Sequence, residues 1–121
     1  MSHPQDPQRP HRSPAREAAI QAALAEMRVE YRAQLPGYLD EISTCIARVQ
    51  RGEGDADDLA RARLLAHRIR GTAGSYGWSA LSQALGRVED TLEAGDAAPA
   101  GEMLAQLAAA LADAKAAFMA V

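Results

Sequence analysis

Apolar residues recur every three or four positions along most of the chain, which is the spacing of one face of an α-helix. Five helical segments follow from this pattern and from the turn residues between them. They cover about residues 16–34, 36–51, 55–76, 79–94 and 99–118. No segment shows the strict alternation of a half-buried β-strand, so the pattern predicts an all-α protein.

Proline, glycine and aspartate mark the expected boundaries. Pro36 is expected to break the chain between the first two segments, because proline disfavours helical backbone at the residue before it. Residues 52–54 form a turn, and Gly77 ends the third helix. Asp55 or Asp57 caps the start of that helix. Four amphipathic helices of similar length predict an up-down-up-down four-helix bundle with an additional N-terminal helix.

The composition favours closely packed helices. The chain has 121 residues, enough for one domain, and only 4% of them are aromatic although 48% are hydrophobic. Nearly a quarter are alanine, which suits helices and not a β-sandwich. The chain has no glycine-rich nucleotide-binding loop, so we expect a partner to complete any chemistry.

The termini, the cysteine content and the charge restrict location and partners. Residues 1–15 are rich in proline and polar residues, so we expect a disordered tail there and a folded domain over 16–121. No apolar run is long enough for a signal peptide or a membrane span, and Cys45 is the only cysteine. We therefore expect a cytoplasmic protein without membrane contacts. A net charge of −3 with few aromatics argues against nucleic-acid binding.

The third helical segment carries a distinctive strip opposite its apolar face. On a helical wheel, His67 points away from the side that holds Leu65 and Ile69. The residues within about 60° of His67 on that wheel are small, apolar or basic, namely Ala60, Arg63, Leu64, Arg70, Gly71 and Gly74. Residues 61–70 include four arginines and no acid, which favours an anionic ligand or an acidic partner. A solvated helix face is the alternative interpretation.

The glycines beside His67 are costly inside a helix, at about 1 kcal/mol each relative to alanine. Gly71 and Gly74 would clear side chains from the surface so that another protein can approach the imidazole. Alternatively, Gly74 and Gly77 mark the frayed end of the helix. An exposed histidine is partly neutral and nucleophilic near neutral pH, and Arg63 and Arg70 would hold an anion against its ring.

Residues 66–77, Ala-His-Arg-Ile-Arg-Gly-Thr-Ala-Gly-Ser-Tyr-Gly, resemble the signature of histidine phosphotransfer (HPt) domains. That signature has an aliphatic residue two positions after the histidine, a basic residue three after, and glycines four and ten after. The resemblance extends from about Arg16 to the C-terminus. It implies that His67 is the phosphorylated residue and that Arg70, where the family more often has lysine, interacts with phosphate and receiver.

The resemblance assigns further residues. Glu89 matches a position where the family often has Glu or Gln near the imidazole. A carboxylate there would accept a hydrogen bond from Nδ1–H and leave Nε2 free to attack. Arg63, Leu64, Gly71 and Gly74 would contact the partner. No metal site is expected, because no Glu stands three residues before any His, as it does in di-metal bundles.

The implied function is that of a phosphocarrier in a bacterial two-component phosphorelay. His67 would carry a phosphoryl group between aspartates of response-regulator receiver domains, with a hybrid sensor histidine kinase as a further partner. We expect no autokinase activity and no cofactor of its own, because the receiver supplies Mg²⁺. We also expect a monomer, since the acceptor histidine needs a free face. The alternative is a helical docking module that binds or sequesters a response regulator without taking phosphate.

Overall fold

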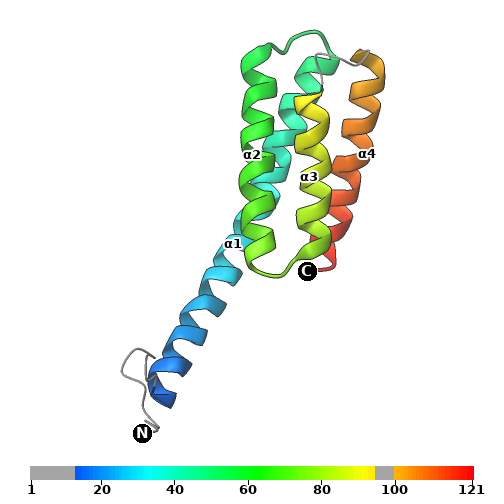
Figure 1. Cartoon of the computed structure of the whole chain (residues 1–121). Helices are drawn as coiled ribbons and strands as arrows, with labels where there is room; N and C mark the ends of the chain where they lie inside the picture. Colours follow the sequence, from blue (N-terminus) through cyan, green and yellow to red (C-terminus); the bar gives the residue numbers. More distant parts are fainter. Residues whose placement is uncertain (1–12, 95–99) are drawn as a thin grey trace, which may run out of the picture. The chain divides into compact units, whose positions relative to one another are not determined.

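A computed structural model describes residues 13–94 and 100–121, and over these ranges it confirms the all-α class. The helices are α1 (Pro14–Gln50), α2 (Ala56–Ser75), α3 (Ser79–Glu93) and α4 (Ala100–Met119) (Figure 1). No strand occurs in the described ranges, and none of their helices has the length and apolar character to span a bilayer. The chain divides into two compact units, residues 1–34 and 35–121.

Two expected boundaries fall at or near the limits of the described ranges. Most of the tail expected over 1–15 lies outside them, but Pro14 and Ala15 belong to the first turn of α1, so the helix begins earlier than expected. The turn expected after residue 94 also lies outside them, and α4 begins at Ala100.

The break expected at Pro36 is wrong. α1 is one continuous helix of 37 residues that includes Pro36, so the expected additional N-terminal helix is the first part of α1. Proline removes one backbone hydrogen bond and crowds the preceding turn. Leu35 immediately before it is completely buried and Leu39 nearly so. Burial of these side chains in the core favours a continuous helix over the local preference of the residue before proline.

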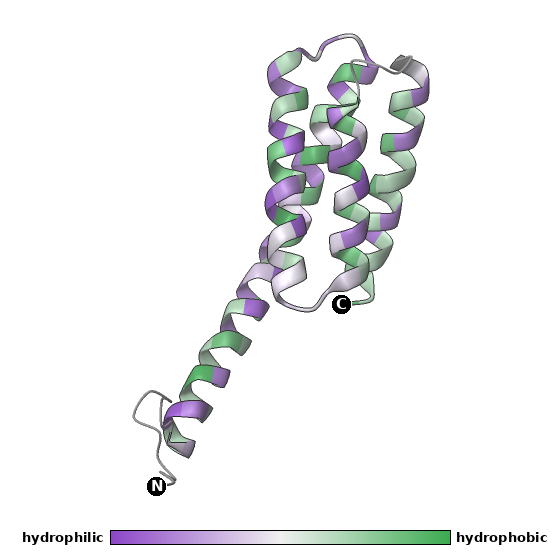
Figure 2. Cartoon of the chain, in the orientation of Figure 1, coloured by the Kyte–Doolittle hydropathy of each residue, from purple (hydrophilic) through white to green (hydrophobic). Residues whose placement is uncertain are grey.

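The second unit, residues 35–121, is a bundle made by the end of α1 with α2, α3 and α4, and successive helices run antiparallel (Figure 1). Polar and apolar residues are interspersed along each helix, as expected for helices with one buried face (Figure 2). The largest completely buried side chains are Leu35, Ile42, Ile69, Leu81, Leu85, Val88 and Leu107. On α2 much of the buried face is alanine, because Ala62, Ala66 and Ala73 are completely buried.

Both ends of α2 are capped by hydrogen bonds. The first of the two candidate aspartates, Asp55, forms a capping box in which it and Asp58 each accept a backbone hydrogen bond from the other, both at 3.1 Å. At the other end Gly77 has a φ of +80°, which favours glycine. The Trp78 N–H then closes the last turn by donating to a carbonyl five residues earlier. The helix that carries His67 therefore has a defined start and end.

Replacing Pro36 with alanine should stabilise the protein. Alanine restores the missing backbone hydrogen bond, and we expect the free energy of unfolding to rise by about 1–3 kcal/mol in urea denaturation, after allowing for the more flexible unfolded chain. Pro14→Ala is the matched control, because proline is tolerated in the first turn of a helix, and it should change stability by less than about 0.5 kcal/mol. A Pro36→Ala protein no more stable than the wild type would contradict a continuous α1.

Candidate functional site

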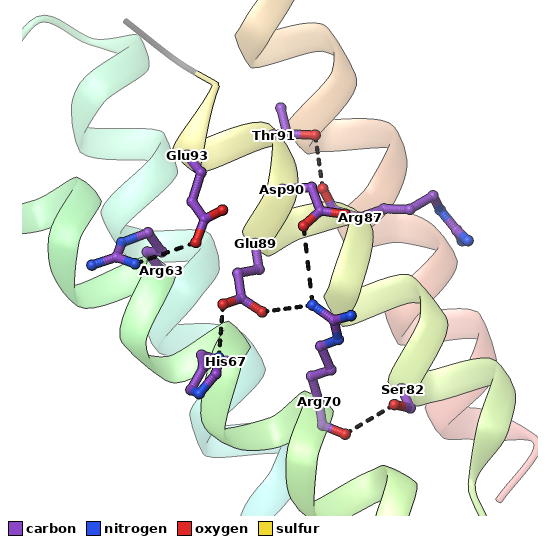
Figure 3. Close-up of polar contacts among 9 residues, drawn as sticks. All are labelled: Arg63, His67, Arg70, Ser82, Arg87, Glu89, Asp90, Thr91 and Glu93. Atoms are coloured by element: carbon purple, nitrogen blue, oxygen red, sulfur yellow. Dashed lines mark hydrogen bonds and ion pairs between the residues drawn. The ribbon is translucent and has the colours of Figure 1, made fainter.

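His67 lies on α2 with its ring directed toward a carboxylate of α3 (Figure 3). Its Nδ1 is 2.7 Å from Oε2 of Glu89. The His67 side chain is 67% exposed, whereas that of Glu89 is only 7% exposed. Nε2, on the opposite side of the ring, has no hydrogen-bond partner among the described residues. One ring nitrogen is therefore held by a buried acid, and the other is available.

The charge of Glu89 determines which nitrogen of His67 carries the proton. Burial raises the pKa of the Glu89 carboxyl, but hydrogen bonds from Arg70 and His67, together with their charges, outweigh it and hold the pKa below its ordinary value. Glu89 is therefore ionised near neutral pH, and a carboxylate only accepts hydrogen bonds. Nδ1 must donate in this contact, so the lone pair of the neutral imidazole lies on Nε2.

Arg70 binds the other oxygen of the same carboxylate. Its Nη1 donates to Oε1 of Glu89 at 3.1 Å and lies 4.0 Å from a carboxylate oxygen of Asp90 (Figure 3). Arg70 and His67 are both on α2, and Glu89 and Asp90 are both on α3. Glu89 thus bridges the two α2 side chains. Their hydrogen bonds compensate the negative charge of a carboxylate that is almost completely buried.

The strip around His67 is less basic than its sequence indicated, because acids from neighbouring helices pair with its arginines. Arg63 lies 3.4 Å from Glu93, and Arg61 pairs with Glu41 of α1. Arg68 has no ion pair within residues 13–94 and 100–121. An anion that approaches Arg63 or Arg70 must therefore compete with an acid already in place.

The expected partner-contacting residues lie on the outer face of α2. Leu64 is 45% exposed and so is available for contact with a partner. A Cβ built on Gly71 would meet nothing within 4 Å, so internal packing does not require a glycine there. Gly74 differs, because its Cβ would lie 3.4 Å from the hydroxyl of Ser82 on α3. Gly71 therefore borders open space, and Gly74 lies where α2 and α3 approach each other.

Three residues of α3 next to the site were missed by the sequence analysis. Ser82 donates a hydrogen bond to the backbone carbonyl of Arg70 at 2.9 Å, Gly86 lies beneath the Arg70 side chain, and Asp90 faces its guanidinium. The available signal was their spacing, because positions 82, 86 and 90 are four residues apart and share one face of a helix. Nothing in the sequence alone shows that this face meets Arg70.

The arrangement suits transfer of an anionic group to an exposed nitrogen. Nε2 is accessible, the carboxylate at Nδ1 can stabilise positive charge on the ring, and Arg70 supplies a nearby cation. Within the described ranges no three His, Cys, Asp or Glu residues lie close enough together to hold a metal ion.

Comparison with known protein families gives one result. The family model described as "Hpt domain" matches residues 26–117, which is most of the chain. No curated protein and no solved structure gives a significant match. The matched range includes His67 and every residue of the site described above.

The depressed pKa of Glu89 predicts a pH-dependent contribution to stability. Its folded-state pKa lies below the unfolded value of about 4.3, so the contribution is fully present above that value and is lost as the pH falls through the folded pKa. In urea denaturation, the stability difference between wild type and Glu89→Gln should therefore shrink as the pH falls from about 5. A difference that stays constant down to pH 2.5 would show that Glu89 is not stabilised in its ionised form.

Proposed function

The chain belongs to the Hpt domain family, whose members are phosphotransfer modules of two-component signalling, and we propose that it carries a phosphoryl group on His67 between aspartates of receiver domains. The observation that carries this proposal is the 2.7 Å contact between Nδ1 of His67 and the ionised Glu89. This contact leaves the exposed Nε2 as the nucleophile.

The proposed step needs no proton to leave the imidazole. The Nε2 lone pair attacks the phosphorus of an aspartyl phosphate, the N–P bond forms, the O–P bond breaks, and the aspartate leaves as a carboxylate. Because Nδ1 keeps its proton, the ring becomes positively charged. The Glu89 carboxylate stabilises that charge. In the reverse direction the charged ring is the leaving group when an aspartate of another receiver attacks.

The partner would supply the rest of the chemistry. A receiver domain brings the aspartate and the Mg²⁺, so this chain needs no cofactor of its own and has no autokinase activity. We propose a cytoplasmic monomer in a bacterial phosphorelay, with a response regulator and a hybrid sensor kinase as partners. In this proposal Arg70 interacts with the transferred group and with the receiver, and Arg63, Leu64, Gly71 and Gly74, which are also on α2, contact the receiver.

The direct test is phosphate transfer from receiver domains. Incubated with Mg²⁺ and a panel of phosphorylated receivers from the source organism, the wild-type protein should gain acid-labile, base-stable phosphate, and ATP alone should give none. His67→Gln should take none while retaining the fold by circular dichroism. Labelling of His67→Gln would overturn the assignment of His67. A wild-type protein that binds a receiver but never acquires phosphate would favour the docking-module alternative.

The open surface at Gly71 predicts a second effect. A leucine at position 71 would project into the space through which the receiver approaches, so Gly71→Leu should lower kcat/KM for phosphotransfer by about tenfold or more. Stability should not fall, because leucine forms helices better than glycine. Gly101→Leu on α4 is the matched control, since a Cβ at Gly101 also meets nothing within 4 Å. Equal kcat/KM values for the two variants would remove Gly71 from the docking face.

A further inference from the structure

Arg70 lies along one face of α3 and is held at three points. The hydroxyl of Ser82 donates to its backbone carbonyl at 2.9 Å. One turn further on, Gly86 faces its side chain, and at the next turn Glu89 accepts a hydrogen bond from its guanidinium at 3.1 Å. Figure 3 shows Arg70 between Ser82 and Glu89. The guanidinium therefore rests on the surface of α3 although its side chain is 48% exposed.

Gly86 lacks a side chain at a point where the Arg70 side chain occupies the space. Among the described glycines only Gly52 and Gly77 have a positive φ, so the backbone at Gly86 accepts any residue. Gly86 is nevertheless buried inside α3, where glycine is a poor helix former. A Cβ on it would stand 3.3 Å from Nε and 3.4 Å from Cζ of Arg70, closer than side chains normally pack. The missing side chain leaves the place where the guanidinium lies.

We infer that Gly86 is a positioning residue of the phosphotransfer site, which seats Arg70 so that Arg70 occupies one oxygen of Glu89 and leaves the other for His67. The inference rests on the proposed function for its consequence in phosphotransfer. Its structural part stands on the contacts of Arg70 alone. Arg70 thereby acts through Glu89 before any phosphate arrives, in addition to its proposed interaction with the phosphate.

The position of the Arg70 guanidinium over Gly86, which we call the Arg70 seat, acts on the carboxylate of Glu89. With Oε1 held by the guanidinium, Glu89 cannot rotate freely and Oε2 stays directed at Nδ1 of His67. The same hydrogen bond from Arg70 helps to keep Glu89 ionised. If the guanidinium leaves, Glu89 loses one of its two hydrogen-bond partners, and both its orientation and its charge become less well defined. The proton of the neutral His67 ring is then held less strictly on Nδ1, so Nε2 is less well defined as the nucleophilic nitrogen.

The Arg70 seat over Gly86 fits the planar guanidinium of an arginine. The atoms nearest to Gly86 are Nε, Cζ and Cδ of Arg70, and the first two belong to the planar guanidinium. Lysine has no planar group that could lie flat on the helix at this point. The glycine at position 86 is therefore matched to the arginine at position 70.

A double-mutant cycle tests the inference without a partner protein. The variants are Gly86→Leu, Arg70→Gln and their combination, and the readout is the titration of the Glu89 side-chain carboxyl by ¹³C NMR. Gly86→Leu should raise the Glu89 midpoint as Arg70→Gln does, although Arg70 is still present. In the Arg70→Gln background, Gly86→Leu should cause no further change. Gly101→Leu is the control for adding a leucine to a helix and should leave the midpoint unchanged.

A smaller substitution covers the case in which Gly86→Leu fails to fold. Gly86→Ala displaces the guanidinium by only a few tenths of an ångström, so it should shift the Glu89 midpoint in the same direction by a smaller amount, and only when Arg70 is present. An unchanged midpoint in Gly86→Ala and in any folded Gly86→Leu protein overturns the inference. So does an equal shift with and without Arg70.

Phosphotransfer measurements separate this inference from the proposed function. With a phosphorylated receiver as donor, Gly86→Leu should slow phosphorylation of His67 by about tenfold, less than the ~100-fold that a misplacement of about 1 Å can cost. If Gly86→Leu shifts the Glu89 midpoint only when Arg70 is present, but the wild type takes up no phosphate, the proposed function is refuted and the positioning role of Gly86 stands. Normal phosphorylation of Gly86→Leu with an unchanged Glu89 titration would refute the seat and leave the function intact.

Discussion

The site depends on one buried carboxylate shared by two side chains of the neighbouring helix. A carboxylate that is removed from water without partners is strongly unfavourable, so Glu89 requires the hydrogen bonds from His67 and Arg70 that the structure gives it. Those bonds in turn fix the proton of His67 on Nδ1. Residues of α2 and α3 alone therefore present a nucleophilic ring nitrogen. This requires two helices held in the correct register.

The alanine-rich composition and the caps of α2 provide that register. Ala66 and Ala73, on either side of His67 along the chain, are completely buried, and small side chains let helices pack closely. Asp55 and Gly77 define the two ends of α2. The close approach of α2 and α3 is thus what brings an acid of α3 within 2.7 Å of a histidine of α2.

Periodicity predicted the features that depend on one helix at a time. It located the helices of the bundle and placed His67 away from the buried face, and Asp55 was one of two caps proposed. It failed at Pro36, where burial of the preceding leucine outweighs a local backbone preference. It also missed Gly86 and the acids that pair with Arg61 and Arg63. These contacts join residues far apart in sequence and depend on how two helices are rotated against each other, which spacing within one helix does not encode.

The chemistry of the site depends on which ring nitrogen of His67 carries the proton in the unphosphorylated protein. ¹⁵N NMR of the imidazole nitrogens, recorded at a pH where the ring is neutral, distinguishes its two tautomers. We expect a proton on Nδ1, hydrogen-bonded to Glu89, and an unprotonated Nε2, with this preference lost in Glu89→Ala. A wild-type ring that carries its proton on Nε2, or a tautomer mixture unchanged by Glu89→Ala, would contradict this expectation.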